Sequence, residues 1–170
     1  LKALVTGGSQ GFGRAVVERL LRSGADVYFW GLDPDRVILA QDELAAMVGA
    51  SNLHRSVYGK VVDVRDERQV TLGAEDVLRT FGGVDILINN AGAFGPTKPT
   101  LEYSLAEWED VLRLNLTSQF IVCRTLVPSM LDRGYGRVVN VASVVGRDAN
   151  PMAPAYSVAK AGVIRFTQAL

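Results

Sequence analysis

The sequence is short of the residues that build disulfide frameworks and metal sites. It contains one cysteine, Cys123, and one histidine among 170 residues. A single cysteine cannot form a disulfide within the chain, which is typical of a protein in a reducing compartment, and we expect a cytoplasmic location. Because His and Cys do not cluster, the sequence also predicts no metal site.

Excess charge and long apolar runs are lacking as well. Eighteen basic residues balance eighteen acidic ones, so the chain has no surplus of positive charge of the kind that nucleic-acid-binding proteins direct at phosphates. No stretch approaches the roughly 20 apolar residues of a membrane span. We therefore expect neither nucleic acid nor membrane as a partner. The 48% hydrophobic and 21% charged content is that of a globular protein, and the length suits a single domain over residues 1–170.

Short apolar runs alternate with helical patterns along the whole chain. The runs predict buried parallel strands over Lys2 to Val5, Val27 to Trp30, Lys60 to Val64, Val84 to Asn89 and Arg137 to Ala142. The helical patterns cover Gly13 to Arg22, Pro34 to Val48, Glu67 to Phe81, Leu105 to Leu131 with a possible interruption, and Ala155 to the end. This alternation predicts an α/β fold, a doubly wound parallel sheet with helices on both faces, whose ligands bind at the carboxyl ends of the strands.

The segment "TGGSQGFG", from Thr6 to Gly13, places four glycines between the first predicted strand and the first helix. A pyrophosphate must come within hydrogen-bonding distance of main-chain N–H groups, and a β-carbon would obstruct that approach. We expect Gly7 to allow the turn out of the strand, Gly11 the close approach, and Gly13 the packing of helix on strand. The alternative, a flexible glycine-rich turn, is weakened by the position of the segment. The loop therefore predicts nucleotide binding.

A second group of polar residues lies further along the chain. Tyr156 and Lys160 are spaced to stack on one face of a helix, where the ammonium would lower the pKa of the phenol and make it a usable general acid or base. Ser143 ends the last predicted strand and could donate a hydrogen bond to a carbonyl oxygen. Asn115 lies inside a helical pattern. Taken singly, such residues are more often a surface pair, a strand end and a solvated or capping amide than functional groups.

Together, and in this order after the glycine loop, these residues resemble the short-chain dehydrogenase/reductase family, whose fold is Rossmann-like. The resemblance covers essentially the whole chain and includes "NNAG" at Asn89 to Gly92. It implies that Tyr156 exchanges the substrate proton, that Ser143 holds the carbonyl oxygen, that Lys160 binds the nicotinamide ribose and lowers the tyrosine pKa, and that Asn115 steadies a proton-relay water.

The resemblance also implies a cofactor site for NAD or NADP. Its residues would be Gly7, Ser9, Gln10, Gly11, Phe12, Gly13, Asp33, Asp63, Val64, Asn90, Ala91, Gly92, Tyr156 and Lys160. Asp63 would hydrogen-bond the adenine; without the family context, capping of the next helix is an equal reading. In the family, an acidic residue at the end of the second strand usually selects NAD, and a basic residue just beyond it favours NADP. Here these positions correspond to Gly31 and Leu32, so neither rule applies. Asp33, close enough along the chain to reach the ribose, favours NAD, whereas an inward Arg36 would favour NADP.

The implied activity is hydride transfer between NAD(P)(H) and a secondary alcohol or ketone. Residues 144–155 resemble segments of both sugar or sugar-acid dehydrogenases and 3-oxoacyl thioester reductases, so both substrates stay open. Phe94, Val145 and Met152 are candidates for the substrate pocket. A nucleotide-binding regulatory module is the non-enzymatic alternative, and an epimerase or dehydratase using bound NAD is a third.

Family members continue beyond the position where this sequence ends, with two more strands. If the chain ended here, the strand at Arg137 to Ala142 would be an exposed, apolar sheet edge, which is a hazard for aggregation. We therefore expect the chain to be a fragment of a longer enzyme. Members usually pair into homodimers or homotetramers, and the segments Phe120 to Met130 and Val158 to Leu170 are our candidates for that contact. Cys123, in the first of these, is interpreted as a packing residue.

Overall fold

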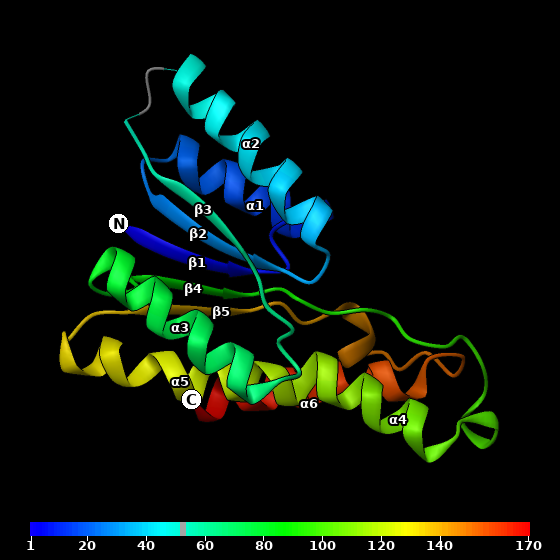
Figure 1. Cartoon of the computed structure of the whole chain (residues 1–170). Coiled ribbons are helices and arrows are strands. Elements are labelled where there is room, and N and C mark those ends of the chain that lie inside the picture. The colour runs from blue at the N-terminus through cyan, green and yellow to red at the C-terminus, as the bar shows by residue number, and fades with distance from the viewer. Residues whose placement is uncertain (52–53) are drawn as a thin grey trace.

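The strands form one parallel sheet, and helices cover both of its faces (Figure 1). The computed structural model describes residues 1–51 and 54–170. The strand order is β3-β2-β1-β4-β5, and every neighbouring pair is parallel. The strands are β1 (Lys2–Thr6), β2 (Asp26–Gly31), β3 (Val57–Val61), β4 (Ile86–Asn89) and β5 (Arg137–Asn140). The predicted doubly wound α/β fold is confirmed.

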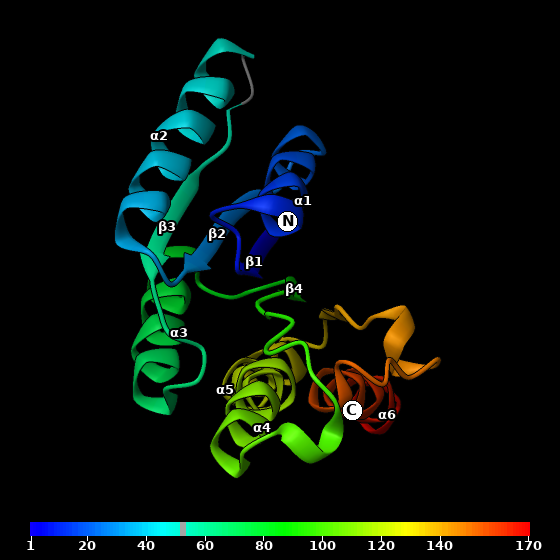
Figure 2. The ribbon, with the colours of Figure 1, turned by 90° about the vertical axis from the view of Figure 1, so that its right-hand side faces the viewer.

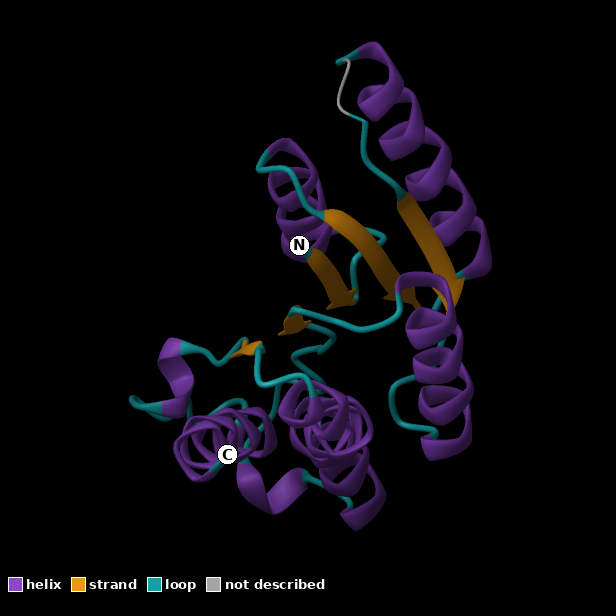
Figure 3. Ribbon diagram, turned by 90° about the vertical axis from the view of Figure 1, so that its left-hand side faces the viewer, coloured by secondary structure: helices purple, strands orange, loops and turns teal. Residues whose placement is uncertain are grey.

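Helices cover the two faces of this sheet. They are α1 (Gly11–Arg22), α2 (Pro34–Ala50), α3 (Glu67–Phe81), α4 (Leu105–Leu112), α5 (Ser118–Asp132) and α6 (Pro154–Ala169). Figures 2 and 3, seen from opposite sides, show α1 and α2 on one side of the sheet and α3, α5 and α6 on the other. Among the described residues, no helix is long and apolar enough to cross a membrane.

Two buried clusters hold the layers together, because alternate residues of a strand point to opposite faces. Ala3 and Val5 of β1 pack with α1 and α2, whereas Leu4 packs with α3 and α5. All three are fully buried. A buried leucine contributes about 2 kcal/mol to stability relative to an exposed one, so the central strand anchors both layers.

Local signals set the ends of the helices. The Asp66 carboxylate accepts hydrogen bonds from the N–H groups of Arg68 and Gln69 at the start of α3, and Gly82 ends that helix with a φ of 72°. These bounds match the prediction from the sequence. Ser104 and Glu107 form a reciprocal capping box at the start of α4. The helix predicted from Leu105 to Leu131 is interrupted by a π-helical turn, Arg113–Thr117, between α4 and α5.

The third strand begins and ends three residues earlier than predicted. We expected Lys60 to Val64, but pairing with β2 runs over Val57–Val61. Val62 and Val64 are buried against Trp30 and α3, although they lie beyond the paired residues. Val62 and Val64 are therefore the buried residues of the loop after β3, while the strand itself lies at the sheet edge with Tyr58 exposed.

Strand β5 forms the opposite edge. It pairs with β4 through Arg137 to Asn140, and in the part of the chain that the structure describes no strand pairs with its other side. Val139 is 49% exposed. The expected open, partly apolar edge is thus present in this chain. The strand is shorter than predicted, since Val141 and Ala142 follow the last pair.

Candidate active site at the carboxyl ends of the strands

A cleft of about 580 Å³ opens where the strands end. Its walls come from the loops after β1, β2, β3 and β4, as expected for a parallel sheet. Eleven of the predicted cofactor residues line it: Gly7, Ser9, Gln10, Phe12, Gly13, Asp33, Asp63, Val64, Asn90, Ala91 and Gly92. The predicted residues Gly11, Tyr156 and Lys160 are not part of its wall.

The glycine loop is shaped by close backbone packing. Gly7 has a φ of +67°, and a β-carbon on Gly13 would lie 2.1 Å from Gly7 O and 2.4 Å from Asn90 Nδ2. These two positions require glycine for the turn and for close packing. Gly11 also has a positive φ, +54°, but a β-carbon there would meet no atom of the described chain within 4 Å. The role of Gly11 in the approach of a ligand stays a prediction.

The start of α1 has the properties of an anion site. Gln10 is its N-cap and makes no side-chain cap hydrogen bond within the described chain. The first N–H groups of the helix therefore keep their donor capacity, next to the partial positive charge of the helix N-terminus. Bare backbone, free donors and a lined cleft together fit the pyrophosphate of a dinucleotide.

The loop after β4 is bonded to the glycine loop. Thr6 Oγ1 accepts from the backbone N–H groups of Asn90 and Ala91, each at 3.0 Å. Asn90 Nδ2 donates to Thr6 O at 3.0 Å and Gly7 O at 3.2 Å. Asn89 Nδ2 donates to Asn140 Oδ1 at 2.9 Å, which ties β4 to β5. The "NNAG" segment thus joins the ends of three strands beside the cleft.

Two acidic residues reach the far end of the cleft. Asp33 caps α2 by accepting from the N–H of Arg36, and its other oxygen lies 3.6 Å from Arg36 Nε. The hydrogen bonds from Arg65 hold the pKa of Asp63 below its usual value. Asp63 does not cap the next helix, because Asp66 does. The Asp63 carboxylate is therefore present as an acceptor at neutral pH, and each of the two acidic side chains lies beside an arginine.

Tyr156 and Lys160 lie on the first turns of α6, near the end of β5. Lys160 Nζ is 5.6 Å from the centre of the Tyr156 ring and donates to Val141 O at 2.6 Å. Lys160 is only 2% exposed, which excludes the surface-pair reading. Burial lowers its pKa to about 8, so the amine stays mostly charged at neutral pH.

Asn115 brings the π-helical turn to the same place. It is fully buried, so the solvated-amide reading is wrong. Its Nδ2 donates to Ala93 O at 2.9 Å and to Val111 O at 3.0 Å, and its Oδ1 accepts from Ala93 N at 3.2 Å. A β-carbon on Gly92 would lie 2.6 Å from Asn115 Oδ1 and 3.7 Å from Lys160 Nζ. Gly92 therefore lies between the amide and the ammonium.

Ser143 and Phe94 complete this region. Ser143 follows β5, and its Oγ accepts from Val145 N at 3.4 Å; no hydrogen bond joins Ser143 to Tyr156 among the described residues. The Phe94 ring lies 4.9 Å from the Tyr156 ring, centre to centre, at 41°. The structure thus brings together Tyr156, Lys160 and Asn115, and sets Phe94 against the tyrosine.

Some residues of the cleft were missed from the sequence: Val62, Arg65, Ala93 and Leu114. Arg65 directly follows Asp63 and Val64, and its partner Asp110 comes from the distant helix α4. The one signal in the sequence that could have indicated Arg65 is its place two positions after Asp63, a predicted site carboxylate.

Cys123 is buried and its pKa is raised to about 11 by burial, in line with a packing role. Within the described chain no three His, Cys, Asp or Glu side chains are grouped to hold a metal ion.

Comparisons with known proteins agree with this geometry. The family model described as short chain dehydrogenase matches residues 2–170. The chain is 40% identical over 168 residues to 2-dehydro-3-deoxy-L-rhamnonate dehydrogenase (NAD(+)) from Sphingomonas sp. (strain SKA58), covering 99% of this chain and 64% of the relative. It is 36% identical to 3-oxoacyl-[acyl-carrier-protein] reductase FabG from Aquifex aeolicus (strain VF5), covering 99% and 65%. The chain thus spans just under two thirds of these relatives.

A solved structure is also similar. The crystal structure of an actinorhodin polyketide ketoreductase with NADPH superposes with a TM-score of 0.90 at 33% identity. The match covers 99% of this chain and 62% of the ketoreductase chain.

Proposed function

Because the chain belongs to the short-chain dehydrogenase family, we propose that the protein is an NAD(P)-dependent oxidoreductase acting on a secondary alcohol or ketone. The observation that carries this proposal is the meeting of Tyr156, Lys160 and Asn115 beside the glycine-loop cleft. When bound, the nicotinamide supplies or accepts the hydride. Residues 1–170 would form a single dinucleotide-binding domain.

The chain's own residues handle the proton. Tyr156 gives its phenolic proton to the carbonyl oxygen during reduction, and takes it back during oxidation. The Lys160 ammonium stabilises the negative charge that develops on the phenol oxygen, and it would also bind the ribose. Because Lys160 is buried, water screens this charge weakly.

Two further residues position the reactants. Ser143 lies in the loop after β5, where its hydroxyl can donate to the substrate carbonyl oxygen. The side-chain amide of Asn115 is hydrogen-bonded to the backbone of Ala93 and Val111 and holds the loop that contains Gly92. We propose that this fixed geometry steadies a water in the proton path.

For the cofactor, we favour NAD over NADP. Asp33 lines the cleft with its carboxylate near the end of β2, where it can accept from ribose hydroxyls. The rhamnonate dehydrogenase relative uses NAD(+) by name, whereas the ketoreductase structure contains NADPH. Arg36 is the competing feature, because it also lines the cleft, where a guanidinium could bind a 2′-phosphate. Dissociation constants for both dinucleotides decide this point; tighter NADP binding would reverse it.

For the substrate, we propose a sugar or sugar acid. The relative at 40% identity supports this class, and a 3-oxoacyl thioester is the alternative that the relative at 36% identity supports. Phe94 and Met152, two candidate pocket residues with exposed apolar side chains, lie on the loops after β4 and β5, which are joined by a hydrogen bond from Lys98 N to Met152 O at 2.9 Å. A non-catalytic nucleotide-binding module is the alternative of a different class.

The test follows the absorbance of the reduced nicotinamide with sugars, sugar acids and 3-oxoacyl thioesters. Tyr156→Phe should lower kcat by about 10²–10⁴-fold while dinucleotide binding stays intact. Tyr58→Phe is the matched control: Tyr58 lies on β3, outside the cleft wall, and should keep full activity. Turnover that survives Tyr156→Phe would remove the proton-transfer role. Dinucleotide binding without turnover of any substrate would favour the regulatory module.

We also propose a cytoplasmic homodimer or homotetramer. The single buried cysteine suits a reducing compartment. Exposed apolar side chains on α5 and α6, Phe120 and Val158, are candidates for the contact between subunits. Light scattering on the purified protein measures the assembly, and polar substitutions at these two positions should reduce its mass.

A further inference from the structure

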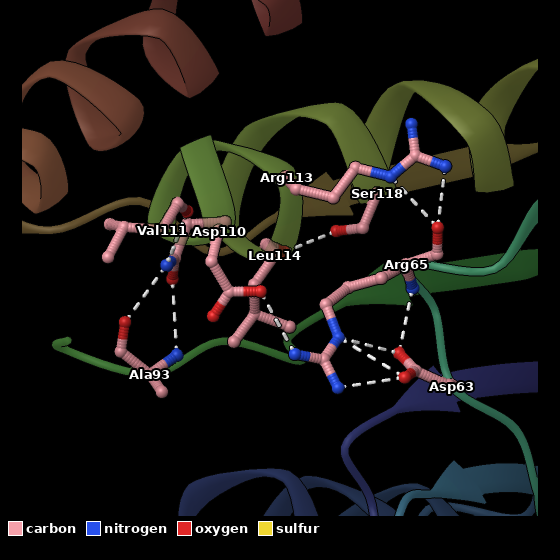
Figure 4. Close-up of polar contacts among 9 residues, drawn as sticks. Asp63, Arg65, Ala93, Asp110, Val111, Arg113, Leu114 and Ser118 are labelled. Carbon is pink, nitrogen blue, oxygen red and sulfur yellow. Dashed lines mark hydrogen bonds and ion pairs between the residues drawn. The ribbon is translucent and has the colours of Figure 1, made fainter. Parts of the chain in front are cut away.

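Arg65 links two parts of the chain that meet beside the cleft. Its guanidinium contacts Asp63 through Nη2 at 2.8 Å and Nε at 3.0 Å, and Asp110 of α4 through Nη1 at 3.1 Å. In return, Arg113 donates to the Arg65 carbonyl oxygen through Nε at 2.9 Å and Nη2 at 2.6 Å. Figure 4 shows these contacts running in both directions between the loop after β3 and the end of α4.

The two halves of this link differ in strength. The Asp63 side chain is 22% exposed and is held by a two-point contact, the strong geometry for a guanidinium and a carboxylate. The Asp110 side chain is 63% exposed, so water and salt weaken that pair. Arg65 therefore orients Asp63 firmly and holds α4 with a weaker contact, to which the two Arg113 hydrogen bonds add.

The helical turn on the far side of the link is the one that holds Asn115. Asp110 and Arg113 flank Val111, whose carbonyl accepts from Asn115 Nδ2 at 3.0 Å. Arg113 is also the first residue of the π-helical turn. Figure 4 shows Val111 and Ala93 on one side of this turn and Arg65 with Asp63 on the other.

We propose that Arg65 is a positioning residue that fixes the Asp63 carboxylate at the adenosine end of the cleft and ties that end to the turn carrying Asn115. This inference rests on the proposed dinucleotide function. Arg65 itself lines the cleft, but all of its guanidinium nitrogens are engaged with the two carboxylates. It therefore acts through Asp63 and through α4.

The experiment compares binding of NAD, or of NADP if that binds more tightly, with binding of nicotinamide mononucleotide, which lacks the adenosine half. Arg65→Met should weaken dinucleotide binding about tenfold, the value of one lost charged hydrogen bond, and leave mononucleotide binding unchanged. Arg65→Lys keeps the charge but loses the two-point contact, so its dinucleotide affinity should lie between those of the unaltered protein and Arg65→Met. Arg68→Met is the matched control: it removes an arginine that is exposed and makes no ion pair in the described chain.

A second variant separates the two ties. Asp110→Asn leaves the contact between Arg65 and Asp63 in place, so dinucleotide affinity should stay within about twofold while kcat falls by about two- to fivefold. Equal weakening of dinucleotide and mononucleotide by Arg65→Met, or no weakening, would overturn the inference. An unchanged kcat in Asp110→Asn would overturn the tie to Asn115. Failure of the unaltered protein to bind either dinucleotide would instead refute the proposed function.

Discussion

Asn115 is bonded to both backbone polar groups of Ala93: it accepts from the N–H at 3.2 Å and donates to the carbonyl oxygen at 2.9 Å. A strand would make the same pair of contacts, but here a side chain makes them. The loop after β4 is therefore held by a helix where the sheet no longer continues. The amide is fully buried, so water cannot replace it.

Replacing this amide should affect stability as well as activity. Asn115→Leu removes all three hydrogen bonds of this amide, of which the one to Val111 O is buried and the two to Ala93 are partly buried, and we expect a loss of about 3 kcal/mol in the free energy of unfolding. Urea titration measures it. Gln168→Leu, the same kind of change at an exposed position of α6, should stay within about 0.5 kcal/mol. Equal effects of the two changes would contradict the structural role of Asn115.

Glycine positions offer a second test. A methyl group on Gly13 would be forced against Gly7 O at 2.1 Å, so Gly13→Ala should destabilise the protein by about 1–3 kcal/mol and weaken dinucleotide binding. Gly49→Ala is the matched substitution in α2: a β-carbon there meets nothing within 4 Å, and it should stabilise by about 0.5–1 kcal/mol. Thermal unfolding of both variants checks the opposite signs. A Gly13→Ala protein as stable as the unaltered one would show that the loop relaxes.

The dependence of stability on pH should reveal the buried amine. The pKa of Lys160 falls from 10.5 to about 8 on burial, so the cost of its charge is fully present below pH 8 and disappears as the pH rises to 10.5. Relative to Lys160→Met, the free energy of unfolding should rise by about 1.4 kcal/mol per pH unit in this window. Urea titrations at pH 7 to 10 measure the difference. Arg68→Met should show no such slope, because arginine does not titrate there. A constant difference between protein and Lys160→Met would contradict the lowered pKa.

Phe94 should influence the substrate and leave the cofactor unaffected. Its ring is 41% exposed and lies 4.9 Å from that of Tyr156. Phe94→Ala removes an apolar wall beside the phenol, and we expect the KM for the alcohol or ketone to rise about fivefold with unchanged dinucleotide affinity. Steady-state kinetics measure both. Leu72→Ala, on α3 and 51% exposed, should leave KM unchanged; a rise in dinucleotide KM for Phe94→Ala would place the ring at the cofactor instead.

Much of the fold could be predicted from local signals in the sequence. The bounds of α3 were predicted correctly because Asp66 caps its start and Gly82 ends it. The third strand was predicted too far along the chain because Val62 and Val64 are apolar for a reason other than pairing: they belong to the loop after β3 and pack against Trp30 and α3. Apolar runs report burial, and strand pairing adds a constraint that one sequence does not display.

The candidate site divides in the same way. Tyr156 and Lys160 were predicted from helical spacing, which places them together in any regular helix. The π-helical turn at Asn115 has no such signal, since "RLNLTS" has an ordinary helical pattern and the turn depends on partners at Ala93 and Val111. Arg65 was missed because its second partner, Asp110, comes from a helix 45 residues away in the chain.

The position of β1 in the middle of the sheet affects how the chain can fold. Ala3 pairs with Val27 on one side and with Ile86 on the other. The second pairing closes a long loop, and its entropic cost is met only after β4 has been synthesised. On the ribosome, one side of β1 therefore stays unpaired until β4 has been synthesised, and until then this open edge is exposed to association with other nascent chains.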